Sequence, residues 1–253
     1  MKPPFRADHV GSLLRPDALL QTRDEWKAGH LSDGELRERE DDAIANVVKK
    51  QEAVGVKSVT DGEYRRESFH FDFISKIAGI ETNFTLKGAF AQGQKTKEGG
   101  EKQVPLTVDV VGRMERPAGG IEVENFRYLK SQASESSAPK ITMPSPTMTH
   151  FRGGRDAISR DAYPEMDDFF ADLARLYREE IADLADVGCR YIQFDDTNLA
   201  YLCDSKMRED ARQRGEDPDD LPKTYAALIN DCIKDRPDDM AACVHLCRGN
   251  ARS

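Results

Sequence analysis

Two side chains that could bind a metal stand two residues apart near the end of the sequence, His245 and Cys247. On a β-strand, residues i and i+2 point to the same face, so an imidazole and a thiol would project together. Zinc binds both, because it accepts soft thiolates as well as imidazoles. The same spacing also fits a small buried cysteine beside a hydrogen-bonded histidine, and short motifs match by chance. Two interpretations of this pair therefore stay open, a zinc site and two core residues.

Two acidic segments follow apolar, strand-like runs. Asp195 and Asp196 end the run at 189–194, and successive strand residues face opposite ways, so only one of the two can point into a site. The other is expected to cap a loop or helix, a role that fits Asp195 equally well. Glu63 follows the run at 56–60 and precedes a pair of arginines. These carboxylates could hold a substrate ammonium or exchange a proton, and a solvated charged loop is the alternative for Glu63.

A further candidate lies close to the N-terminus, where Gly11 precedes Ser12. Glycine lets a ligand approach the backbone closely, and the serine offers it a hydroxyl and an amide. A plain turn between a strand and a loop explains the pair almost as well.

The candidate residues follow a repeated pattern, in which an amphipathic helix ends at Val-Gly and a short β-branched run then ends in acidic residues. Apolar residues at helical spacing predict helices at about 32–54 and 166–187, and Ser32 opens the first with a capping box. The runs at 56–60 and 189–194 are predicted strands. Further strands are expected at 104–111, 140–143 and 240–245, and a further helix at about 223–234.

Alternating helices and strands predict a parallel α/β fold. Polar residues gathered at the C-terminal ends of successive strands are typical of a (β/α)8 barrel, whose active site lies at that end. A doubly wound open sheet would place ligands similarly, but no G-x-G-x-x-G or Walker A motif follows any predicted strand. We therefore expect a TIM-type barrel with the candidate residues at its mouth.

The composition of the 253 residues is that of a globular protein, with 33% charged and 38% hydrophobic residues. A formal net charge of -9 argues against nucleic acid or an anionic membrane as the main partner. No apolar run approaches the ~20 residues that span a bilayer, and the N-terminus lacks the apolar core of a signal peptide. Five scattered cysteines indicate reduced thiols and a cytoplasmic protein.

Four segments, HVGSLLRP, DGEYRR, YIQFDD and HLCRGN, occur in an order that resembles the single-barrel relatives of the cobalamin-independent, zinc-dependent methionine synthase family. The resemblance covers essentially the whole chain. It implies that His245 and Cys247 are the first two zinc ligands, which are followed in the family by a later glutamate and a later cysteine. It also implies that Ser12, Glu63 and Asp195 contact homocysteine.

The activity implied by the resemblance is methyl transfer from a 5-methyltetrahydrofolate-type donor to homocysteine, which gives methionine. Zinc bound to the homocysteine sulfur would lower the pKa of the thiol, so that the nucleophile is present near neutral pH. Two alternatives stay open. One is another zinc-thiolate alkyl transfer on the same barrel, for example to a coenzyme M-like thiol. The other is a decarboxylase-like or binding barrel in which the His-x-Cys pair belongs to the core.

Only six residues follow Cys247, so the later glutamate and cysteine of the family have no counterpart. Two ligands make a weak zinc site, because stable sites use three or four protein ligands. We therefore expect residues 1–253 to form a single catalytic barrel domain that is truncated at its C-terminus and lacks the last strands. The chain by itself is expected to retain zinc weakly and to have little or no activity.

Overall fold

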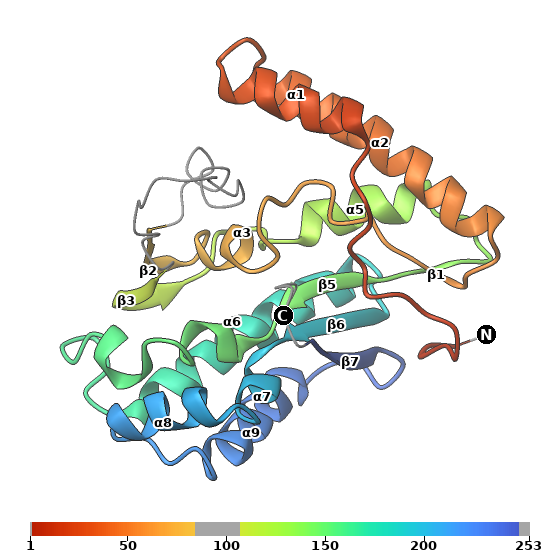
Figure 1. Ribbon diagram of the computed structural model, residues 1–253. Coiled ribbons are helices and arrows are strands. Elements are labelled where there is room, and N and C mark those ends of the chain that lie inside the picture. Colours follow the sequence, from red (N-terminus) through yellow and green to blue (C-terminus); the bar gives the residue numbers. More distant parts are fainter. Residues whose placement is uncertain (1, 84–106, 248–253) are drawn as a thin grey trace.

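The computed structural model describes residues 2–83 and 107–247, which form a mixed α/β structure (Figure 1). Its helices are α1 (Asp17–Lys27), α2 (Asp33–Ala53), α3 (Phe71–Ile74), α5 (Val123–Gln132), α6 (Met166–Asp186), α7 (Asn198–Tyr201), α8 (Ser205–Gln213) and α9 (Leu221–Ile233), with short 3-10 helices η1 (Pro146–Thr149) and η2 (Gly154–Ala157). Its strands are β1 (Ser58–Val59), β2 (Ala78–Thr82), β3 (Val108–Glu115), β4 (Ala138–Pro139), β5 (Ile141–Pro144), β6 (Tyr191–Asp196) and β7 (Ala241–Leu246). None of the helices in these two ranges is long and apolar enough to cross a membrane.

The strands of the described residues form three separate sheets. In the largest, β5, β6 and β7 lie parallel in that order, and the connections between them run through α6 and through α7 to α9. β1 pairs in parallel with β4, whereas β2 and β3 pair antiparallel. The prediction of parallel α/β units is therefore confirmed.

The (β/α)8 barrel, predicted to be truncated and to lack its last strands, is confirmed only as a mixed α/β fold, because the sheets of the described residues do not close into a barrel. Among these residues the strand order ends at β7 on one side, and the segment that carries β4 and β5 changes partner from β1 to β6. Pro139 and Pro144 end those two short strands, and a proline cannot donate to a strand ladder. The architecture shown is thus an open, mixed α/β arrangement.

α6 and β6 form the centre of the structure. One face of α6 is buried, including Phe169, Leu173, Ile181 and Leu184, and it packs against α9 beneath the three-stranded sheet (Figure 1). All six residues of β6 are buried, because the helices cover one face of the strand and polar side chains of the interior cover the other. The C-terminal end of β6 is consequently held in a rigid setting.

The helix boundaries agree closely with the sequence pattern. α2 follows Ser32, whose hydroxyl accepts from the Glu35 amide at 3.3 Å while the Glu35 carboxylate accepts from the Ser32 amide at 2.8 Å, which is the predicted capping box. α9 and β7 begin within two residues of their predicted starts. The predicted strand at 104–111 corresponds to β3, which begins at Val108, and residues 104–106 lie outside the described residues.

Candidate functional site

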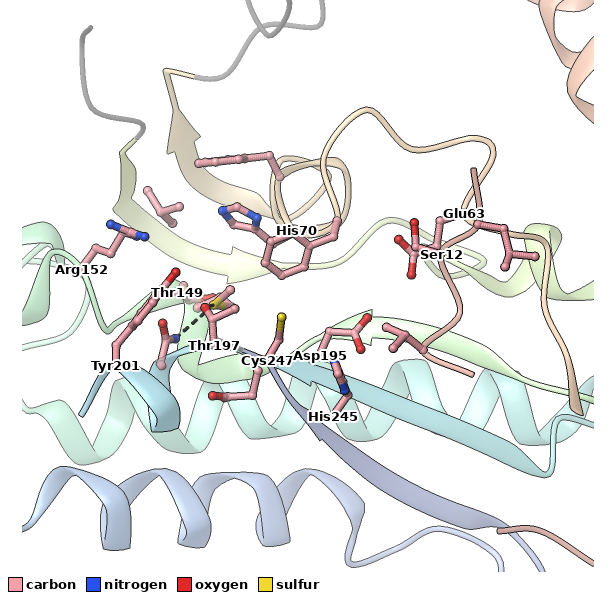
Figure 2. Close-up of a pocket in the computed structure, with 18 of the residues that line it drawn as sticks. Ser12, Glu63, His70, Thr149, Arg152, Asp195, Thr197, Tyr201, His245 and Cys247 are labelled. Carbon is pink, nitrogen blue, oxygen red and sulfur yellow. Dashed lines mark hydrogen bonds between the residues drawn. The ribbon is translucent and has the colours of Figure 1, made fainter. Parts of the chain in front are cut away.

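A cavity of about 1330 Å³ lies beside the C-terminal ends of β6 and β7 (Figure 2). Its walls come from the N-terminal segment, the turn after β1, the segment before and at the start of α3, the η1–η2 region and the ends of the two strands. The five side chains predicted to form a site all line it: Ser12, Glu63, Asp195, His245 and Cys247. The structure therefore brings together residues that are widely separated in the sequence.

His245 and Cys247 lie at the end of β7, on the side of the strand that faces the cavity. Val244 and Leu246 alternate with them and are 41% and 58% exposed on the opposite side. The ladder between the strands sets His245 opposite Asp195, and the Cys247 amide donates to the Asp196 carbonyl at 2.9 Å. The imidazole and the thiol thus project into one space, as the i, i+2 spacing requires.

The donor chemistry of this pair fits zinc, since imidazole nitrogen and thiolate sulfur are its usual ligands. Among residues 2–83 and 107–247, however, no group of three or more His, Cys, Asp or Glu side chains surrounds a metal position. The pair thus offers two possible donors, fewer than the three or four protein ligands that zinc sites use.

Glu63 has an unusual backbone conformation. Its φ is 57°, in the left-handed region that glycine adopts easily and other residues rarely do, and Gly62 before it has a φ of 68°. Three hydrogen bonds hold this turn: the Glu63 amide donates to the Asp61 carboxylate at 2.8 Å, and the Glu63 carbonyl accepts from Arg15 at 2.8 Å and from the Arg66 amide at 3.1 Å. Strained backbone of this kind persists where the surroundings over-determine it, often at functional sites.

The carboxylates of Glu63 and Asp195 lie on facing walls of the cavity (Figure 2). Oε1 of Glu63 accepts from the Thr142 hydroxyl at 3.0 Å, and Oδ1 of Asp195 accepts from the Gln193 amide at 2.6 Å. Burial, together with the charge of Glu63, raises the pKa of Asp195 to about 7. A cationic group placed between the two carboxylates would relieve this repulsion.

Asp196 has the capping role expected for one member of the acidic pair. It is fully buried, and its carboxylate accepts from the Leu199 amide at 2.8 Å and from the Thr147 hydroxyl at 2.6 Å. Asp196 therefore joins the start of α7 to η1; it lines the cavity as Asp195 does, but hydrogen bonds from the described residues reach both of its carboxylate oxygens.

Ser12 is exposed on the N-terminal segment that covers the cavity next to Glu63 (Figure 2). Gly11 allows this approach, because it has a φ of 121° and a Cβ there would stand 2.5 Å from the Thr142 methyl group. The Gly11 carbonyl accepts from the Thr60 hydroxyl at 2.7 Å, which ties the segment to the end of β1. The close backbone approach predicted for this glycine is therefore to the protein interior.

Several cavity residues were not predicted. On the side away from Glu63, the wall is made by Phe69, His70, Met148, Arg152 and Tyr201. The Arg152 guanidinium lies 5.7 Å from the centre of the Tyr201 ring, a cation–π distance. No motif marks these residues, because they come from loops whose approach depends on the tertiary fold. Aromatic rings therefore line this half of the cavity, unlike the carboxylate half.

Comparison with known proteins matches residues 5–249 to the cobalamin-independent synthase catalytic domain. YxjH of Bacillus subtilis, a protein described as uncharacterized, is 38% identical over all of this chain, which spans 64% of YxjH. The 5-methyltetrahydropteroyltriglutamate–homocysteine methyltransferase of Vibrio cholerae is 28% identical over 79% of this chain and 24% of its own length.

Among solved structures, a putative vitamin-B12 independent methionine synthase from Listeria monocytogenes is 36% identical and superposes with a TM-score of 0.76. That likeness covers 98% of this chain and 67% of the Listeria chain. The family match and the shared fold cover nearly the whole sequence, including every residue of the cavity. The chain belongs to the cobalamin-independent methionine synthase family and corresponds to its catalytic domain.

Proposed function

We propose that the protein carrying this chain transfers a methyl group to the sulfur of homocysteine and so forms methionine. The observation that carries this proposal is the pair of carboxylates, Glu63 and Asp195, which face the same cavity as His245 and Cys247. An α-amino acid thiol has a partner for each of these pairs: its ammonium would bind the two carboxylates, and its sulfur would lie at His245 and Cys247. Membership of the methionine synthase family supports the same reaction.

His245 and Cys247 are the residues that would hold zinc, with further ligands outside the described residues. When bound, zinc lowers the pKa of a coordinated thiol and so supplies a thiolate near neutral pH. Glu63 and Asp195 would bind the ammonium, and Ser12, on the exposed segment beside them, would contact the amino-acid end. The amino-acid end is thereby fixed and the sulfur is oriented toward the aromatic half of the cavity.

The methyl donor would occupy the aromatic half of the cavity. The sulfur forms a bond to the methyl carbon while the bond between that carbon and the donor nitrogen breaks, and the released nitrogen takes up a proton. A 5-methyltetrahydrofolate-type donor has a flat ring system that suits a wall of aromatic side chains such as Phe69 and Tyr201. A cytoplasmic location fits the five cysteines, all described and none in a disulfide.

A coenzyme M-like acceptor is disfavoured by the same two carboxylates. Such a thiol carries an anionic sulfonate and no ammonium, so Glu63 and Asp195 would repel it or be left without a partner. A decarboxylase-like or binding barrel with the His-x-Cys pair in its core is disfavoured as well, because His245 and Cys247 line the cavity together with the two carboxylates.

The test is methionine formation by the full-length protein, prepared with zinc, from L-homocysteine and 5-methyltetrahydrofolate. We expect turnover in the parent and loss of both zinc and turnover in Cys247→Ser. Cys203→Ser is the matched control, because Cys203 is exposed and does not line the cavity. Full turnover by Cys247→Ser, or a zinc-free parent that is fully active, would refute the proposal.

A further inference from the structure

Thr142 on β5 and Gln193 on β6 are directly opposite each other in the ladder between these strands. Both are buried beneath the cavity. The Thr142 hydroxyl donates to Oε1 of Glu63 at 3.0 Å, and the Gln193 amide nitrogen donates to Oδ1 of Asp195 at 2.6 Å. Each of the two cavity carboxylates therefore accepts a hydrogen bond from a neutral side chain of this strand pair.

A buried cation fixes the direction of each donor. Arg66 donates to the Thr142 hydroxyl oxygen at 3.0 Å, which leaves the hydroxyl proton free to point at Glu63. Lys140 donates to Oε1 of Gln193 at 3.1 Å. An ammonium has only donors, so the Gln193 oxygen must face Lys140 and the amide nitrogen must face Asp195. Arg66 and Lys140 are 3% and 1% exposed, so water does not compete for these positions.

The two sets of contacts follow the same order, in which a buried cation contacts a neutral side chain and that side chain donates to a carboxylate. In both, the hydrogen bond that reaches the carboxylate from the described residues falls on one oxygen, Oε1 of Glu63 or Oδ1 of Asp195, and the Arg66 guanidinium approaches the same Oε1 to 3.8 Å. The second oxygen of each is left for a ligand in the cavity. Two such oxygens on facing walls match a group with several N–H donors and a positive charge.

We propose that Thr142 and Gln193 are positioning residues that make the site selective for a primary ammonium. They touch no ligand themselves; they hold the two carboxylates in the orientation that receives one. This inference rests on the proposed function, since it assumes that the ligand is an amino acid such as methionine. Selectivity for the ammonium would then depend on the strand pair below the cavity as well as on the residues that line it.

The test compares two ligands that differ only in the amino group, L-methionine and 4-(methylthio)butanoate, by titration calorimetry on the full-length protein. Gln193→Glu keeps an acceptor for Lys140 but removes the donor to Asp195, and Thr142→Val removes the hydroxyl at constant shape. We expect either change to weaken methionine binding at least about 10-fold, or ~1.4 kcal/mol, because a hydrogen bond to a charged group is lost or misdirected. Binding of the analogue should stay within about 2-fold, well under the ~1.4 kcal/mol of a tenfold change.

Two controls separate positioning from general damage. Thr142→Ser retains the hydroxyl and should retain the preference of the parent for methionine. Gln213→Glu introduces the same charge change at an exposed position at the end of α8 and should leave both affinities unchanged. If Thr142→Val does not fold, Thr142→Ala removes the same hydroxyl with a smaller side chain, and Gln193→Glu tests the other member of the pair.

The possible results lead to different conclusions. If the parent binds the two ligands equally, the amino-acid site of the proposed function is wrong. If the parent prefers methionine and the variants keep that preference, the proposed function stands and the positioning role is overturned. An equal loss for both ligands in Gln193→Glu would also overturn it, since that pattern indicates a structural role.

Discussion

His70 lies on the cavity wall, where its ring contacts those of Phe69 and Phe71 at centroid distances of 4.5 and 4.1 Å. Burial, and next the positive charge of Arg152, lower the pKa of His70 from 6.5 to about 4. The folded protein therefore keeps this histidine neutral at pH values where the unfolded chain already binds a proton. Its contribution to stability is fully present above about pH 6.5 and is lost as the pH falls toward 4.

The size of the effect follows from the two pKa values. At pH 5 the unfolded chain is almost fully protonated at this position and the folded protein almost not at all, which lowers the free energy of unfolding by about 2 kcal/mol relative to pH 8. Other buried groups also change protonation between pH 8 and pH 5. The effect of His70 is therefore obtained as the difference between the free energies of unfolding of the parent and of a variant that lacks this histidine. Urea unfolding of the parent and of His70→Phe is compared from pH 8 to pH 5.

Between pH 8 and pH 5 the free energy of unfolding of His70→Phe should fall by about 2 kcal/mol less than that of the parent, because phenylalanine keeps a ring but cannot bind a proton. His30→Phe, at an exposed position, serves as the control and should follow the parent at every pH. Parallel curves for the parent and His70→Phe would show that His70 is not held neutral in the fold, and the reasoning from burial would be wrong.

Two further predictions concern stability and reactivity. Glu180 is 1% exposed and accepts from the amides of Ile121 and Glu122, so Glu180→Gln should lower the free energy of unfolding by about 2 kcal/mol in urea, while Glu179→Gln beside it should change it by less than about 0.5. A larger loss in the Glu179 variant would contradict this assignment. Cys203 is exposed and should react with a thiol reagent in the native protein, whereas Cys189 is buried with a pKa raised by burial to about 12 and should react only on unfolding. Modification of Cys189 at the rate of Cys203 would contradict the packing around the start of β6.

The local pattern of the sequence predicts much of the helical and strand structure. The stripe in α6, the capping box of α2 and the strand that ends in Asp195 all follow from spacing over a few residues, and the structure confirms them. The alternation rule predicts that only one of Asp195 and Asp196 faces the site, whereas both line the cavity and Asp196 also accepts a hydrogen bond at a helix start.

Contacts between distant residues could not be predicted in this way. Glu63 is not glycine, so its residue type does not indicate a positive φ; of the three hydrogen bonds that hold the turn, the one from Arg15 comes from 48 positions away. The support from Arg66 through Thr142 spans 76 positions. Strand pairing between distant segments is equally non-local, and the sequence pattern alone did not predict which strands pair in the three sheets of the described residues.

Position 63 has to satisfy two opposed demands. Its backbone has a left-handed φ, which glycine, asparagine or aspartate adopt at less cost than glutamate. Its side chain must reach the Thr142 hydroxyl and still present an oxygen to the cavity, which requires the longer carboxylate. Selection for stability alone would therefore replace Glu63 with glycine, whereas selection for ligand binding would retain it. In a directed-evolution experiment, the residue found at position 63 would report which of the two pressures was acting on the protein.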